Sequence, residues 1–533
     1  MKHINVTCFT LLYCLTAFPA HARVWYAKPN ANGDGESWST AANVRAILSK
    51  PTVAAGDEVW VAAGRHYWYP ALVLKEGVSL YGGFAGAETS RDERDPSANE
   101  TRMEGYWANT VIHAGPGITE ATVVDGFTIT KGGGHRVYGY EFPRHVSNYF
   151  HMGGGLFIEG SPTISNNIIT GNDTTLHEQV DPYNVELPGD GGGIYIKSGS
   201  PRIVDNTIAG NRAKNGGGIL VAGGNPLIRG NRIIANETTS TEASAYVKNG
   251  GGIAIMPSPS GSSVTGGAVT DNIISGNSAA RGGGIHTQSW NIVHITRNRI
   301  SGNSAQKGGG LSNTSRMEVI SNVIDGNTAT VSGGGVYSEY AGLLRNNTIA
   351  GNTSPMGAVY LTAINQASLV NNIIAGNSTG VAVSSPQNIV MTSSDVFRNG
   401  DQNYMGLPDK TGTGGNISAD PLFLDLPNGD YRLRTGSPAL DAGTDTGILP
   451  DELDFSGQPR TQGPHVDMGA HESLVVDQAA FANAIRALRI AGGADAYQSG
   501  TDGVLDLVQT DSVGPIDFRD AAAWARKACG LQP

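Results

Sequence analysis

Basic side chains recur just before a repeated glycine triplet. Four successive triplets are preceded, within two residues, by Lys214, Lys248, Arg281 and Lys307. If these side chains stack on adjacent repeats about 5 Å apart, their like charges repel one another and need compensation. An anionic ligand such as a uronic-acid polysaccharide would supply it. The alternative is that exposed cations only keep the repeats apart and discourage edge pairing.

Three of these residues could take part in the cleavage of a uronate chain by β-elimination. That reaction needs a cation to neutralise the carboxylate, a base for the C5 proton and an acid for the leaving oxygen. We assign Lys248 as the base, Arg281 as the carboxylate neutraliser, and His286 or Lys307 as the proton donor. These roles rest on position within the repeat alone.

Strand alternation after each triplet predicts two outward-facing columns of side chains. Four of the eight positions in the first column are aromatic and could stack on sugar rings. The alternative is that these rings stack on one another and stabilise the sheet surface. The candidate substrate-binding residues, including those of the loops and the basic turn, are Phe157, Tyr195, Lys197, Lys214, Tyr337, Tyr360, His135, Arg136 and His177.

Long insertions interrupt the repeat and are expected to lie on one edge. The first is the segment "GHRVYGYEFPRHVSNYFHM", and the second spans residues 173–190. Further excess residues lie around 237–248 and 257–266. Long loops on a rigid scaffold usually carry function, so we favour a substrate-cleft wall. The spacing of His135, His145, His151 and His177 matches no zinc pattern, so no metal site is assigned.

Two other functions stay open from the residues. A glycoside hydrolase would need two carboxylates that flank the scissile bond. Glu159 with Asp190, or Glu339 with a loop acid, could supply them. A non-catalytic surface or adhesive protein that binds glycans is the other alternative.

The repeat itself predicts the fold. Gly-Asn pairs recur about every 25 residues from Gly276 onward, and each unit holds three short alternating apolar runs between Gly, Asn, Pro and Ser. Three strands and three turns per repeat describe one coil of a parallel β-helix. One set of asparagines is expected to stack from coil to coil as a structural feature: Asn166, Asn206, Asn298, Asn322, Asn346 and Asn371.

Most of the chain resembles the right-handed parallel β-helix superfamily of secreted bacterial proteins. The segments "GDEVWVAAGRHY", "GVSLYGGFAGAETSRDERDP" and "GSPTISNNIITGN" carry this resemblance, and "GDYRLRTGSPALDAGT" with "VDMGAHES" is similar to the closing segment of choice-of-anchor Q proteins. The resemblance implies an all-β right-handed parallel β-helix. The superfamily includes polysaccharide lyases and hydrolases, so fold alone does not assign an activity. In its lyases, Lys, Arg, His or Tyr act from such turns, sometimes with calcium.

The ends divide the chain into four parts. Residues 1–22 have a basic start, an apolar stretch and a small-residue ending, which predicts a signal peptide cleaved after Ala22 and a secreted or cell-surface protein. Residues 23–57 form an N-terminal cap with a short helix in "SWSTAANVRAILSK", residues 58–475 the β-helix, and residues 476–533 a helical tail. No transmembrane span is predicted, and the net charge of −11 argues against nucleic acid as a partner.

The tail resembles a degenerate dockerin module. Asp511, Asp517 and Asp520 match acidic positions of a calcium loop, but Gln509 and Val513 stand where oxygen ligands are expected. We therefore expect a helical pair without metal and assign no certain cofactor, with calcium as the alternative. The resemblance implies a surface or cohesin-like partner for this tail, beside the anionic polysaccharide expected for the β-helix.

Overall fold

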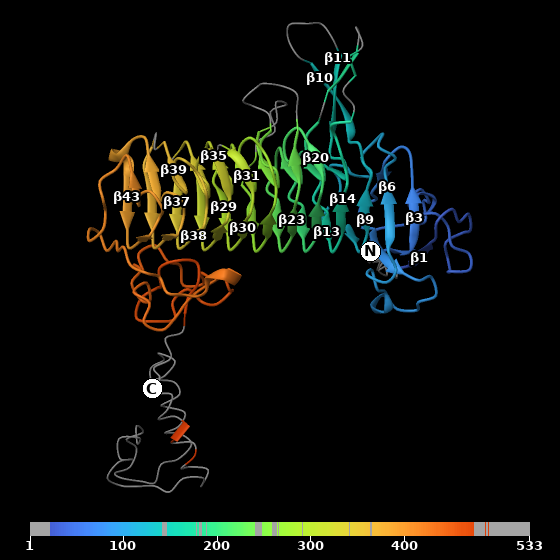
Figure 1. Ribbon diagram of the computed structural model, residues 1–533. Helices are drawn as coiled ribbons and strands as arrows, with labels where there is room; N and C mark the ends of the chain where they lie inside the picture. The colour runs from blue at the N-terminus through green and yellow to red at the C-terminus, as the bar shows by residue number, and fades with distance from the viewer. Residues whose placement is uncertain are drawn as a thin grey trace, which may run out of the picture.

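Three long parallel sheets run along the molecule, and successive coils stack side by side from the N-terminal to the C-terminal end (Figure 1). The computed structural model describes residues 22–473, apart from 141–146, 177–178, 181–183, 188, 240–247, 258–263, 265, 290, 341 and 363–364, together with residues 485, 486 and 489. The three sheets are sheet A with 13 strands, from β1 (Val24–Ala27) to β43 (Ile389–Thr392), sheet B with 12, from β3 (Gly64–Tyr67) to β44 (Asp395–Phe397), and sheet C with 12, from β4 (Leu72–Val73) to β45 (Tyr404–Met405). The predicted β-helix is confirmed.

Each coil contributes one short strand to each sheet. In one coil these are β18 (Arg202–Val204), β19 (Thr207–Ala209) and β21 (Ile219–Val221). Their inward side chains, Ile203, Ile208 and Ile219, are fully buried. A strand of three residues offers its central or terminal aliphatic side chain to the interior, so the core is a stack of isoleucine, leucine and valine layers.

Two asparagine ladders hold neighbouring coils together. In one ladder, Asn303 Nδ2 donates to Asn327 Oδ1 at 3.0 Å and to the Ile274 carbonyl at 2.9 Å. Its Oδ1 accepts the Asn277 amide at 2.9 Å. The other ladder passes through Asn206, Asn298 and Asn322 at the turn from sheet A to sheet B. The predicted coil-to-coil hydrogen bonding is confirmed.

Three of the expected ladder members stand one residue too early. Asn166, Asn346 and Asn371 have φ angles of 53–55°, and the residue after each of them occupies the ladder. The left-handed corner before the ladder tolerates asparagine, so both positions of an Asn-Asn pair look alike in the sequence.

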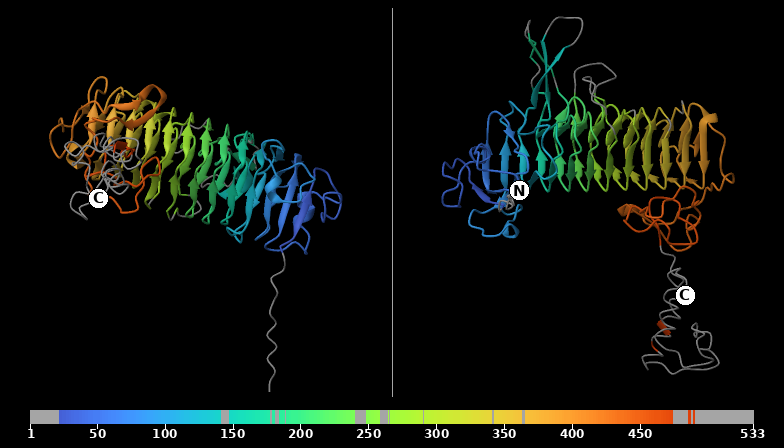
Figure 2. Two further views of the ribbon diagram at one scale, coloured as in Figure 1. Left: turned by 90° about the horizontal axis from the view of Figure 1, so that it is seen from below. Right: turned by 180° about the vertical axis from the view of Figure 1, so that it is seen from behind.

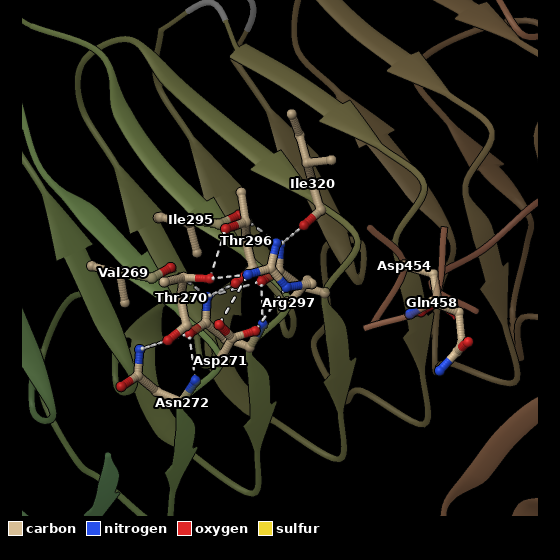
Figure 3. A network of polar contacts seen from close by, with 12 residues as sticks. Val269, Thr270, Asp271, Asn272, Ile295, Thr296, Arg297, Ile320, Asp454 and Gln458 are labelled. Atoms are coloured by element: carbon tan, nitrogen blue, oxygen red, sulfur yellow. Dashed lines mark hydrogen bonds and ion pairs between the residues drawn. The ribbon is translucent and has the colours of Figure 1, made fainter. Parts of the chain in front are cut away.

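The same corner is stabilised by ion pairing between coils where asparagine is absent (Figure 3). Asp271 and Arg297 occupy this position on adjacent coils with φ of 57° and 53°. Arg297 donates from Nε to Asp271 Oδ1 at 2.7 Å and from Nη2 to Asp271 Oδ2 at 2.9 Å. Nη2 also donates to Thr270 Oγ1 at 3.0 Å. A bidentate pair therefore links the two corners.

The connection from sheet B to sheet C carries most of the insertions. An arm rises from it, built by β10 (His135–Tyr140), β11 (Ser147–Met152), β16 (Asn184–Leu187) and β15 (Gln179–Val180) (Figures 1 and 2). The excess at residues 257–266 instead lies between β25 (Ile253–Ile255) and β26 (Ala268–Thr270), in the connection from sheet C to sheet A. The expectation of one common edge is wrong for that insertion.

Both ends of the β-helix are covered. The predicted cap helix is α1 (Val44–Leu48), with Asn43 as its N-cap and Val44, Ile47 and Leu48 buried. At the other end, residues 417–473, the closing segment, fold back along the outer face of sheet B, as the orange chain shows in Figures 1 and 2. In this segment β46 (Phe423–Asp425) pairs with β47 (Asp430–Leu433). Among the described residues, no helix combines the length and apolarity needed to cross a bilayer.

The ladder predicts a large cost for losing one asparagine. We expect Asn303→Ala to lower the free energy of unfolding by roughly 3 kcal/mol, because buried amide and carbonyl groups on both neighbouring coils lose their partners. Asn303→Ser should cost less, since Ser394 occupies a ladder position and accepts the Asn372 amide through Oγ at 3.1 Å. Chemical denaturation measures both. An equal effect from Asn428→Ala, whose side chain makes an exposed hydrogen bond to Asp425, would contradict the assignment.

Candidate functional site

The outer face of sheet C brings the predicted first column together. Strand pairing aligns, on successive coils, the residues Phe157, Tyr195, Leu220, Ala254, His286, Ser312, Tyr337 and Tyr360. The order and the register are as predicted.

The column is covered rather than open to solvent. Phe157, Tyr195 and Tyr337 are 2%, 5% and 3% exposed, and Tyr360 is half-buried. The chain entering each triplet folds over the column: a Cβ atom at Gly333 would lie 2.8 Å from the Tyr337 Cβ. The expectation that Phe157, Tyr195 and Tyr337 offer free faces to sugar rings is therefore wrong for this conformation.

The rings stack on one another instead, which is the alternative open from the sequence. Phe157 and Tyr195 lie parallel with ring centroids 5.5 Å apart, and Tyr337 and Tyr360 do so at 5.6 Å. His135, from the arm, also stacks on Phe157, with ring centroids 4.5 Å apart. These contacts stabilise the sheet surface.

The four basic residues do not form one ladder. Arg281 pairs through its backbone with Lys307 on one side and with Asn249 on the other. Lys248 therefore stands one residue earlier than this register, and so does Lys214, because an asparagine separates each of them from its triplet. The Asn249 side chain donates to Asn215 Oδ1 at 3.2 Å. The expected row of four stacked cations is reduced to Arg281 and Lys307.

These two cations join a polar set that we call the arginine–tyrosine cluster: Arg281, Lys307, Tyr337 and Glu339. Arg281 Nη1 lies 3.1 Å from Glu339 Oε1. The Tyr337 hydroxyl donates to the same oxygen at 3.0 Å, and Lys307 Nζ donates to the Tyr337 hydroxyl at 3.3 Å. The Arg281 and Glu339 side chains are 25% and 30% exposed, so solvent reaches the cluster.

The surroundings fix the protonation of two column residues. Burial, and then the Glu339 carboxylate, raise the pKa of Tyr337, so its phenol stays protonated. Burial, and then Arg281, lower the pKa of His286 to about 3. His286 is therefore neutral near pH 7 and does not offer the imidazolium proton expected of a donor. Its Nδ1 and the Ser312 Oγ are buried, and neither has a hydrogen-bond partner among the described residues.

A second polar set, the histidine–glutamate cluster, lies nearer the N-terminal end of the same face. Glu159 accepts Lys197 Nζ at 2.8 Å and contacts His113 Nε2 at 3.0 Å. Burial raises the pKa of Glu159, but these two hydrogen bonds outweigh it and lower the pKa. Burial and His113 lower the pKa of His135. Sequence reasoning missed His113, which pairs in register with Phe157 but precedes the first glycine triplet.

Two further predicted residues, Arg136 and Asp190, make other contacts. Arg136 places its guanidinium carbon 3.6 Å from the Tyr149 ring centroid on the arm. His145 and His177 are outside the described residues. Asp190 accepts the Asn215 side chain at 3.0 Å. The part of the chain that the structure describes holds no group of three His, Cys, Asp or Glu placed to bind a metal.

A family model of a right-handed β-helix agrees with the architecture. The family model "Right handed beta helix region" matches residues 118–324, and "Periplasmic copper-binding protein (NosD)" matches residues 246–413. A crystal structure of the pectate lyase Pel9A has a TM-score of 0.44 at 14% identity, over 85% of this chain and 97% of that one. The Dettilon tailspike protein has a TM-score of 0.31 at 15% identity, over 75% and 69%. No curated protein matches.

The residues between 246 and 413 do not fit a copper site. The only histidines in this range are His286 and His294. His286 is buried within the sheet C face, and the exposed His294 contacts Glu318 at 2.9 Å. Copper binding by proteins uses several convergent ligands, and the described part of this range brings together no group of three His, Cys, Asp or Glu.

The low pKa of His286 predicts a pH-dependent stability. Below about pH 6.5 the unfolded chain protonates this imidazole while the folded chain does not. The contribution of the neutral side chain is complete above that pH and is lost as the pH falls toward about 3. Between about pH 7.5 and 4.5, wild type should lose roughly 2 kcal/mol more unfolding free energy than His286→Asn. Ser312→Ala should keep the wild-type pH dependence, and identical curves for all three proteins would contradict this.

Proposed function

Since the chain is a right-handed parallel β-helix protein, we propose that it acts on an extracellular acidic polysaccharide and cleaves a uronate chain by β-elimination. The observation that supports this most directly is the arginine–tyrosine cluster. A guanidinium, an ammonium and a protonated phenol lie within one hydrogen-bonded set that solvent reaches. These are the groups that carboxylate neutralisation and leaving-group protonation require.

Arg281 binds the uronate carboxylate in this proposal. A guanidinium has five N–H donors, and the contact with Glu339 uses Nη1. The remaining donors can take a second carboxylate in bidentate fashion. Neutralising that carboxylate makes the C5 proton easier to remove.

Lys248 and Tyr337 handle the protons. The Lys248 carbonyl accepts the Arg281 amide at 3.2 Å, so the two residues lie on adjacent coils at neighbouring positions. The side-chain nitrogen of Lys248 takes the C5 proton, the C5–H electron pair forms the C4=C5 bond, and the C4–O4 bond breaks. Tyr337 protonates the leaving O4 and regains a proton from Lys307, whose Nζ is 3.3 Å from the phenol oxygen. The sequence assigned the proton donor as His286 or Lys307. In this proposal Lys307 supplies the proton, and Tyr337 delivers it to the leaving oxygen.

A non-catalytic glycan-binding protein is the second candidate. It is favoured by the contact of Glu339 with Arg281, because the chain itself supplies part of the charge compensation expected from a ligand. A hydrolase has less support. Its general acid needs a raised pKa, whereas the pKa of Glu159 is lowered.

Export and anchoring complete the proposal. The signal peptide at residues 1–22 would send the protein out of the cell, and the tail at residues 476–533 would dock on a surface or cohesin-like partner. Both segments lie almost wholly outside the described residues.

The test is ultraviolet absorbance of the unsaturated uronate product. Purified protein is incubated with polygalacturonate, alginate and hyaluronan, with and without calcium. We expect Arg281→Ala, Lys248→Ala and Tyr337→Phe each to lower the initial rate at least a hundredfold. Arg229→Ala, which removes an exposed cation from sheet A, should keep the wild-type rate. Product formation that survives in Arg281→Ala would contradict the site, and glycan binding without any product would favour the second candidate.

A further inference from the structure

A group of exposed tyrosines lies at the N-terminal end, away from the arginine–tyrosine cluster. Tyr67, Tyr69 and Tyr106 are 53%, 71% and 64% exposed. Among the described residues five large aromatic side chains are exposed: these three, the adjacent Trp107 at 40% and Tyr340 at 38%. Such a concentration of apolar rings in solvent usually marks a binding surface.

The first coil places two of these rings by simple alternation. Along β3 (Gly64–Tyr67) and the following turn, His66 and Trp68 point inward and are buried, while Arg65, Tyr67 and Tyr69 point outward. The Trp68 indole donates to the Val111 carbonyl at 3.2 Å. From α1, Arg45 donates to the Ala71 carbonyl at 3.1 Å and to the Pro70 carbonyl. These anchors hold the turn that carries Tyr69.

The third ring is presented by an unfavourable backbone. Tyr106 and Trp107, after β6 (Thr101–Glu104), have φ angles of 59° and 61°. Each non-glycine residue in this region costs about 1 kcal/mol or more. The next coil fixes the turn, since its Thr130 and Lys131 carbonyls accept the Gly105 and Trp107 amides at 3.1 and 2.7 Å. Two successive aromatic residues in this costly backbone conformation indicate a functional role.

The rings line a cleft whose other walls are polar and carry no carboxylate. The cleft has a volume of about 740 Å³, within the range of small-ligand sites. Tyr67 and Tyr106 have ring centroids 6.3 Å apart at 45°, so they form two inclined walls rather than a stack. Beside the three tyrosines, its lining includes Arg45, Arg65, Asn30, Asn32 and Asn43.

A buried carboxylate beneath the cleft fixes its exposed arginine. Glu104 Oε2 lies 2.6 Å from Arg65 Nε and 3.2 Å from Lys131 Nζ, with the Glu104 side chain 1% and the Arg65 side chain 56% exposed. Arg102 Nη1 lies 3.9 Å from Glu104 Oε1, so three cations share this one acid. In a chain of net charge −11, a cleft lined by arginine and asparagine with no acid is suited to an anionic ligand.

The geometry points to a saccharide-binding site in this cleft, for a short stretch of acidic polysaccharide. The tyrosine faces would lie against the apolar faces of the sugar rings, Arg65 would pair with a uronate carboxylate, and the asparagines would bond to hydroxyl groups. We call this the tyrosine cleft. It lies on the first two coils, whereas the arginine–tyrosine cluster begins beside β28 (Ile285–Thr287), so it would hold the polymer at a distance from the cleavage site. The inference does not depend on lyase activity.

The test is affinity electrophoresis in the Arg281→Ala background, which disables the proposed cleavage site. Gels contain polygalacturonate, alginate, hyaluronan or a neutral β-glucan. We expect retardation in at least one acidic gel, weakened by added salt. Adding Tyr69→Ala or Tyr106→Asn should weaken the affinity roughly tenfold. Asparagine tolerates the left-handed backbone at position 106, so the second variant removes the ring without straining the turn.

Another exposed tyrosine of the same chain provides the control. Tyr340→Ala removes an exposed tyrosine on a distant coil and should leave the retardation unchanged. Retardation that is the same with and without Tyr69 and Tyr106, or absent from every gel, overturns the inference. A dimer seen by light scattering that Tyr69→Ala converts to a monomer would assign the cleft to contact between chains instead. If Arg281→Ala loses the cleavage rate but is still retarded in the gel, the cleft binds the polysaccharide independently of the cleavage site.

Discussion

Where a coil carries the glycine triplet, it crosses toward sheet C through positions where a side chain has no room. A Cβ atom at Gly283 would lie 2.5 Å from the Gly309 and Ser304 carbonyl oxygens, and one at Gly284 would lie 2.6 Å from the Gly310 oxygen. The first glycine of the triplet, Gly282, has a φ of 62° and turns the chain over the column of sheet C. Only glycine meets both demands, which are close backbone approach and a left-handed turn. Two features of the outer face of sheet C follow from this constraint. The column is covered, and the residue before each triplet is held beside it.

The two polar clusters are separated along the sheet C column. Between them the outward positions carry Leu220 and Ala254, which pack into an apolar patch with Phe157 and Tyr195. Glu159 and Glu339 both follow a sheet C strand and both accept bonds from cations on other coils, Lys197 one coil away and Arg281 two coils away. Their surroundings differ, because the arm supplies His135 beside Glu159, whereas a phenol donates to Glu339. One repeated scaffold thus produces two carboxylate environments with different proton chemistry.

The fold could be predicted from the sequence because each part of the repeat corresponds to one local structure. Gly-Asn pairs, glycine triplets and three-residue apolar runs are local signals, and each corresponds to a turn, a close approach or a strand. The register of the sheet C column was predictable for the same reason. Its burial was not, since nothing in "GGGIHT" shows that the preceding turn folds over the strand. The one-residue offset of Lys214 and Lys248 from Arg281 was predictable from the asparagine that separates each lysine from its glycine triplet. His113 and the tyrosine cleft lie in the first coils, which lack the triplet, so no repeated signal drew attention to them.

The closing segment changes how the solenoid resists unravelling. A simple stack is held only by contacts between neighbours, so its terminal coil can peel away alone. Here Tyr431 and Ala470 pack on Val323 and Ala350, while Leu433 and Met468 pack on Ile373 and Ala375. These partners belong to β34 (Val323–Asp325), β38 (Thr348–Ala350) and β41 (Ile373–Ala375), three consecutive coils. The segment acts as a clasp across them. Fraying from the C-terminal end must first release the clasp, so the last coils open together as one cooperative unit rather than one after another.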